Sequence, residues 1–187
     1  APSVPTVDLL TTNDNVPTIT GTADSGDELT VMLNGVTYAE GDGNLTDNGD
    51  DTWMLNVPDA NALPDGTYDV MATATDAAGN SSSDATLDEL TIDTTAPTVP
   101  TVDLLTTNDS TPTITGTADS ADDLSVMLNG VTYTEGDGNL TDNGDDTWTL
   151  VVPDANALPD GTYDVMATAT DAAGNNSSDA TTDELTI

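Results

Sequence analysis

The chain has 187 residues, with 35 Asp and Glu but no Lys, Arg, His or Cys, and its formal net charge is −35. Nucleophilic catalysis normally needs a base such as His or Lys, so only carboxylates could act as a base here. Nucleic acids and anionic membranes are bound through Lys and Arg, and we therefore exclude both as partners. A pair of catalytic carboxylates would need a cleft that a compact β-domain does not offer. We do not expect an enzyme.

Alternating apolar residues predict short antiparallel strands. In chain order we expect them near residues 4–10, 18–23, 29–34, 36–40, 52–57, 68–76 and 85–92, separated by Gly, Pro, Asn and Asp. The side chains expected to face inward include Leu29, Val31, Leu33, Trp53, Leu55 and Val57. Asn34-Gly35 predicts a type I′ hairpin, because both central residues of that turn need positive φ.

The whole sequence repeats once, with a shift of 95 positions: residues 1–92 differ from residues 96–187 at only 11 positions. A repeat of this size is a complete domain. We predict an all-β chain of two tandem immunoglobulin-like Greek-key β-sandwiches of about seven strands each, arranged end to end. The domains would be residues 1–92 and 98–187, with a short Pro-containing linker at 93–97. The segment Leu63 to Tyr68 supports this fold, since the Tyr hydroxyl is expected to hydrogen-bond back across a corner.

The acidity is almost entirely Asp, with 30 Asp against 5 Glu. Asp is common in turns, and it also supplies short carboxylates for loop-built sites that bind hard cations. Both interpretations remain open. With no Phe, the core must rely on one Trp, the Tyr residues and small aliphatic side chains. Each domain carries about half of the negative charge, so we expect a fold of marginal stability that bound cations would stabilise.

Four segments carry a family resemblance: TITGTAD at 18–24, LPDGTY at 63–68, TDAAGN at 75–80 and the linker DTTAP at 93–97. Together they resemble the bacterial Ig-like repeats in the extender regions of giant, type I-secreted RTX-type adhesins of biofilm-forming and ice-binding bacteria. The resemblance implies a secreted, extracellular location on the bacterial surface and Ca2+ bound at the domain junctions. It also implies a monomer whose partners are neighbouring identical repeats, without membrane contact by this segment. The absence of Cys and of any apolar run of transmembrane length agrees with an interior slice of such an array.

A calcium site is expected where the two repeats meet. In an Ig sandwich the B–C and F–G loops lie at the same end as the start of strand A. The carboxylates there would repel each other unless a divalent cation lay among them, and Ca2+ accepts six to eight oxygen ligands. The predicted ligands are Asp119, Asp122, Asp123, Asp171 and Asn175 of the second repeat, together with Asp93 of the linker. Their counterparts in the first repeat are Asp24, Asp27, Asp76 and Asn80, and the opposite end of that repeat could add Asn13, Asp14, Asp59 or Asp65.

A second acidic cluster lies in the insert 41–51, which is richer in Asp than the usual turn of the family. It contains Asp42, Asp47, Asp50 and Asp51, repeated as Asp137, Asp142, Asp145 and Asp146. The insert lacks the Glu at the twelfth position of an EF-hand loop, and its Gly residues do not match that loop either. It is therefore either a metal loop or a solvated acidic loop.

Two functions remain after these exclusions. One is a structural spacer, stiffened by calcium, that projects a distal ligand-binding region away from the cell. The other is a binding module, in which outward threonines such as Thr18, Thr20 and Thr22 contact a glycan or ice. Threonine alternation is also ordinary for a solvated strand face, and an aromatic platform for sugars is missing.

Overall fold

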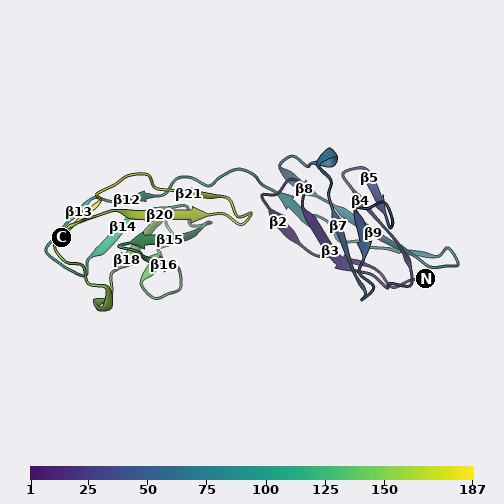
Figure 1. Cartoon of the computed structure of the whole chain (residues 1–187), viewed down its shortest axis with the longest axis horizontal. Coiled ribbons are helices and arrows are strands. Elements are labelled where there is room, and N and C mark those ends of the chain that lie inside the picture. The colour runs from purple at the N-terminus through teal and green to yellow at the C-terminus, as the bar shows by residue number, and fades with distance from the viewer. The chain divides into compact units, whose positions relative to one another are not determined.

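The computed structural model describes all 187 residues, which form two compact units, Ala1–Thr94 and Thr95–Ile187. Each unit is an all-β sandwich (Figure 1). The helical segments are two 3-10 turns, η1 (Asp59–Asn61) and η2 (Asp154–Asn156). Neither turn has the length or apolar character of a membrane-spanning helix.

The first repeat contains short strands arranged in three sheets. The strands are β1 (Thr6–Val7), β2 (Leu10–Thr12), β3 (Thr18–Thr22), β4 (Glu28–Leu33), β5 (Val36–Ala39), β6 (Leu45–Asp47), β7 (Thr52–Asn56), β8 (Gly66–Tyr68), β9 (Val70–Thr75), β10 (Ser81–Ser83) and β11 (Leu90–Ile92). The sheets have the strand orders β1-β3-β7-β6, β10-β9-β4-β5 and β2-β11-β8. Strands β2 and β11 pair in parallel, and all other pairs are antiparallel.

The second repeat has the same topology. Its strands are β12 (Thr101–Val102), β13 (Leu105–Thr106), β14 (Thr113–Thr117), β15 (Asp123–Leu128), β16 (Val131–Thr134), β17 (Leu140–Asp142), β18 (Thr147–Val151), β19 (Thr162–Tyr163), β20 (Val165–Thr170), β21 (Asn176–Ser178) and β22 (Leu185–Thr186). The sheets are β12-β14-β18-β17, β16-β15-β20-β21 and β13-β22-β19.

The structure corrects the predicted count of about seven strands, because each repeat has eleven. The predicted strand 4–10 is two strands, β1 and β2, that belong to different sheets, and the predicted strand 68–76 changes sheets at Asp69. The last strand of the first repeat begins at Leu90 and not near residue 85. Two strands were missed: β6 inside the acidic insert and β10 after the loop 76–80.

The core of each repeat lies between the sheets, as the period-two pattern predicts. Leu29, Val31, Leu33, Trp53, Leu55 and Val57 are all buried. The Asn34-Gly35 turn is confirmed, with φ of 48° and 79°. The tyrosine corner is confirmed as well, because the Tyr68 hydroxyl donates to the Pro64 carbonyl oxygen at 2.7 Å.

Gly21 allows the first strand to approach the buried tryptophan closely. A Cβ at this position would collide with the Thr6 carbonyl oxygen and with the Trp53 ring. The Trp53 indole N–H donates to that same carbonyl oxygen at 3.2 Å. Glycine is therefore required here by space and not by backbone conformation.

Candidate metal-binding carboxylates

The B–C loop of the second repeat, between β14 and β15, and the F–G loop, between β20 and β21, meet at one end of the sandwich. Asp123 at the start of β15 lies opposite Thr170 at the end of β20, so Asp171 follows directly beside the B–C loop. The Asp119 carboxylate accepts the Ala121 N–H at 3.0 Å, and its carbonyl oxygen accepts the Asp122 N–H at 3.1 Å. The predicted residues of this repeat therefore lie on two adjacent loops.

The electrostatics of this end differ from one carboxylate to the next. Burial, followed by repulsion from Asp119, Asp171 and Asp123, raises the pKa of Asp122 above its ordinary value. The Asn175 side chain, which donates to Asp171 Oδ2 at 2.8 Å, is the main cause of a lowered pKa at Asp171. The influence of three neighbouring carboxylates on Asp122 means that these acids lie close enough to interact.

The first repeat has the same loop geometry. Asp24 accepts the Gly26 N–H at 3.0 Å, and Asp76 Oδ2 accepts the Asn80 side-chain amide at 2.8 Å. The terminal amino group of Ala1 lies 3.9 Å from Asp76 Oδ2. The F–G loop is therefore at the end where strand A begins, as the Ig topology requires.

The opposite end of the first repeat carries Asp14, Asp65 and Asp93. The Asp93 N–H donates to the Thr12 carbonyl oxygen at 3.0 Å, while Asp65 accepts both the N–H and the hydroxyl of Thr94. Asp14 accepts the Val16 N–H at 2.9 Å within the A–B loop. Asp65 thus ties the tyrosine corner to the start of the linker, and Asp14 orders the turn before β3.

The donor set at these ends suits a hard cation, because every candidate offers oxygen ligands and the chain contains no His or Cys. No group of three or more acidic side chains is already arranged around a common point that could hold a metal ion. Several carboxylates instead accept backbone N–H groups of their own loops. A carboxylate oxygen keeps a second lone pair when it accepts one hydrogen bond, so these residues could still coordinate after small side-chain rotations.

The acidic insert 41–51 uses its carboxylates to fix its own fold. Asp42 accepts the N–H groups of Ala39, Asn44 and Leu45, and the bond from Asn44 is the largest cause of a lowered pKa at Asp42. Asp47 accepts the Gly49 N–H at 2.8 Å, and the second repeat repeats this pattern with Asp137 and Asp142. These contacts favour the interpretation of the insert as a structured, solvated loop.

The threonines of β3 are hydrogen-bonded to their neighbours. Thr20 donates to Asp8 at 2.7 Å and Thr18 donates to Asn56 at 2.8 Å. Thr22 and Thr6 share a hydrogen bond of 2.7 Å. Each of these hydroxyls is hydrogen-bonded to a neighbouring side chain on the strand face, which argues against a dedicated binding surface.

The sequence did not predict that one glutamate is buried in each repeat. Glu89 and Glu184 are each 2% exposed, although the chain has no cationic side chain to accompany them. The alternation in Asp88-Glu89-Leu90 carries no signal for burial of a carboxylate. Each lies directly before the last strand of its repeat, β11 or β22.

The sequence matches the family model described as the bacterial Ig-like domain twice, over residues 6–94 and 101–187. The chain therefore belongs to this family of bacterial Ig-like domains, which are typically non-catalytic structural domains. The sequence comparison with curated proteins finds no match.

Comparison with solved structures finds several similar chains. The fibronectin(III)-like modules of Clostridium thermocellum CbhA are 14% identical, with a TM-score of 0.50 and coverage of 94% of this chain and 90% of that chain. A 1.5-MDa bacterial ice-binding adhesin is 20% identical, with a TM-score of 0.40 and coverage of 100% and 66%. A tetra-tandem repeat from the extending region of a large adhesion protein is 26% identical, with a TM-score of 0.36 and coverage of 94% and 47%. The chain thus spans 66% and 47% of the last two structures.

Proposed function

We propose that this chain is a structural spacer of a bacterial cell-surface adhesin, which calcium stiffens at the junction between repeats so that a distal ligand-binding region is held away from the cell. The observation that carries the proposal is the repetition itself: two bacterial Ig-like domains, identical at all but 11 aligned positions, follow each other across a short Pro-containing linker. Near-identical domains in series add length. The proposal places the chain outside the cell and assigns it no catalytic activity.

The strand topology supports a role under tension. Strand β2 follows the N-terminal segment and pairs in parallel with β11, which leads directly to the linker. Tension applied to the two ends of a repeat pulls these parallel strands in opposite directions along their length. The backbone hydrogen bonds between them, such as Leu10 N–H to Glu89 O at 2.8 Å and Asp93 N–H to Thr12 O at 3.0 Å, then share the load in shear.

The charge distribution supports calcium as the stiffening ion. A chain without cationic side chains cannot neutralise its carboxylates internally. The raised pKa of Asp122 reflects burial first and then repulsion at the end where Asp119, Asp123 and Asp171 gather. A divalent cation bound there would relieve that repulsion. Asp93, Asp65 and Asp14 would contribute from the first repeat, whereas Asp24, Asp27, Asp76 and Asn80 would serve the junction with a preceding repeat.

Thermal unfolding of the 187-residue protein tests the calcium part of the proposal. Extracellular calcium modules bind at roughly 10⁻⁴ to 10⁻³ M. A ligand present at one hundred times its dissociation constant stabilises the folded state by about 2.7 kcal/mol, so calcium should raise the Tm by several °C over EDTA. Magnesium at equal ionic strength controls for charge screening. Equal melting curves in calcium and EDTA would contradict calcium binding.

The competing function, a glycan- or ice-binding module, predicts a different result. A spacer should give no signal on a glycan array and no enrichment in an ice-affinity assay. Binding in either assay that is lost when Thr18, Thr20 and Thr22 are replaced together by Val would favour the binding module over the spacer.

A further inference from the structure

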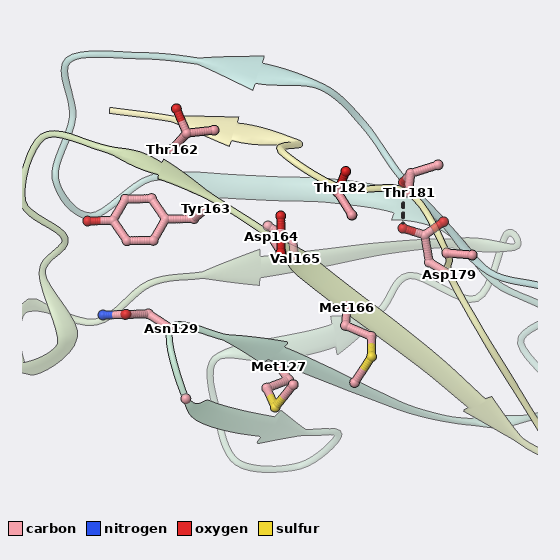
Figure 2. Close-up of a pocket in the computed structure, with 12 residues that line it drawn as sticks. Met127, Asn129, Thr162, Tyr163, Asp164, Val165, Met166, Asp179, Thr181 and Thr182 are labelled. Atoms are coloured by element: carbon pink, nitrogen blue, oxygen red, sulfur yellow. Dashed lines mark hydrogen bonds between the residues drawn. The ribbon is translucent and has the colours of Figure 1, made fainter.

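Both repeats have a pocket at the same place, beside the Asn-Gly hairpin. In the second repeat it has a volume of about 540 Å³ and lies between that hairpin, the segment 162–166 and the segment 179–182 (Figure 2). The corresponding pocket of the first repeat, about 360 Å³, is lined by Met32, Asn34, Tyr68 and Asp69 among others. Volumes of this order suit a small ligand or a single side chain.

The walls of the pocket are fixed by hydrogen bonds and strand pairing. Met127 and Met166 are paired across β15 and β20, and their side chains are 40% and 39% exposed. The Tyr163 hydroxyl donates to the Pro159 carbonyl oxygen at 2.7 Å. Behind the wall, the Val165 N–H donates to the buried carboxylate of Glu184 at 3.0 Å. The pocket is therefore largely formed before any ligand arrives.

The side chains of the pocket combine apolar surface with negative charge. Figure 2 shows Met127 and Met166 near its centre, Tyr163 and Asn129 toward one end, and Asp179 with Thr181 toward the other. Asp164 accepts the Asp183 N–H through Oδ1 at 2.9 Å, and its Oδ2 has no protein donor. Asp179 accepts the Thr181 hydroxyl through Oδ2 at 2.7 Å.

We propose that this pocket binds an organic cation, that is, an ammonium or guanidinium group on a short apolar stem. The chain has no cationic side chain, so a positive charge in the pocket must come from a ligand. The thioethers and the aromatic ring accommodate an alkyl stem, and the face of the ring attracts a cation. The carboxylates of Asp164 and Asp179 supply the counter-charge. An anionic ligand would be repelled. This binding activity is additional to the spacer role and does not depend on it.

Methyl NMR of the 187-residue protein tests the proposal directly, because four of its five methionines line the two sheet faces concerned. The probe is n-butylguanidinium chloride, titrated against NaCl of equal ionic strength. We expect saturable shifts of the Met127 and Met166 methyl groups, with a dissociation constant on the order of 1 mM for so small a ligand. Met54, on β7 of another sheet, is the internal control. The affinity should fall as salt rises.

A charge-removing substitution provides the matched test. Asp164→Asn keeps an Oδ1 acceptor for the Asp183 N–H and removes the charge, so it should weaken binding in the second repeat about fivefold. The pocket of the first repeat serves as reference, and Asp154→Asn, on η2 outside the pocket, should have no effect. Comparing n-butylguanidinium with a blocked tripeptide containing Arg distinguishes a small-molecule cation from a protein side chain as the source of the group.

Several results would overturn the proposal. These are an equal response to n-butanol or a neutral disaccharide, an unchanged affinity in Asp164→Asn, or shifts confined to the acidic loops without a response of Met127 and Met166.

Discussion

The backbone N–H of Val70 donates a hydrogen bond of 3.0 Å to the buried Oε2 of Glu89, and Val165 makes the same bond to Glu184. Val70 is the first residue of β9, where the chain has just left the sheet that contains β8. The Asp88 N–H returns the contact by donating to Asp69 Oδ1 at 2.9 Å. Glu89 also accepts the Leu10 N–H through its carbonyl oxygen. One glutamate therefore holds three strand segments together where strands change sheets.

Replacing both glutamates by alanine, Glu89→Ala and Glu184→Ala, should destabilise the protein. Each change leaves a buried valine N–H without an acceptor, which costs about 1 to 3 kcal/mol per repeat. Urea unfolding measures the loss. The Gln pair is the control, since its amide oxygen can still accept from Val70 and Val165 and should retain more of the stability. Gln variants as unstable as the Ala variants would argue against the hydrogen bond as the cause.

Gly21→Ala should destabilise the first repeat by several kcal/mol. The added methyl group collides with the Thr6 backbone and the Trp53 ring, and neither can move without breaking the indole hydrogen bond. Calorimetry of the full chain should then show two transitions, one unchanged. Gly26→Ala is the matched control, because the second repeat already has Ala121 at that position. A single unchanged transition in Gly21→Ala would show that the strand can shift without cost.

Two of the carboxyl groups with shifted pKa values in the second repeat, Asp171 and Asp122, should respond to pH in opposite directions. Asp171 has a lowered pKa, so its contribution to stability is complete above its ordinary pKa and is lost as the pH falls through the folded-state value. Asp122 has a raised pKa, so its ionised form opposes folding once the pH rises above the ordinary value. Carboxyl carbon NMR titration measures both. Asp119→Asn should lower the pKa of Asp122, and an unchanged value would contradict the repulsion described.

Asp93→Ala should loosen the link between repeats while both domains remain folded. If calcium at the junction uses this carboxylate, the variant should lose part of its calcium-dependent stiffness. Amide relaxation measures it, because two loosely joined domains tumble more independently than two stiffly joined ones. Asp145→Ala, in the insert of the second repeat, removes the same charge and should leave the relaxation unchanged. Global unfolding of Asp93→Ala would place its role within the first domain.

Much of the fold was predictable, because inward residues such as Val31 and Leu55 follow a strict period of two and Asn34-Gly35 has one favoured turn. The strand breaks were not. Asp69 fits the alternation of a continuous strand, and the break depends on Glu89, which lies far away in the sequence. Strand β6 was not predicted because Gly and Asn residues surround Leu45 in the sequence. The burial of Leu45 comes from tertiary packing.

The candidate site was predictable in its location and not in its detail. Ig topology alone places the loops of Asp119 and Asp171 at one end. Sequence cannot show which way a carboxylate turns, because Asp residues such as Asp42 have backbone N–H groups of their own loop within reach. The same local chemistry explains why Asp enrichment pointed equally to turns and to cation sites.

Small-angle X-ray scattering of the 187-residue protein in calcium and in EDTA tests the central claim most directly. A calcium-stiffened spacer should have a larger maximum dimension and a narrower distribution of interdomain distances in calcium, and both changes should diminish in Asp119→Asn with Asp122→Asn. Superimposable scattering profiles in calcium and EDTA, with the domains folded in each, would contradict the claim.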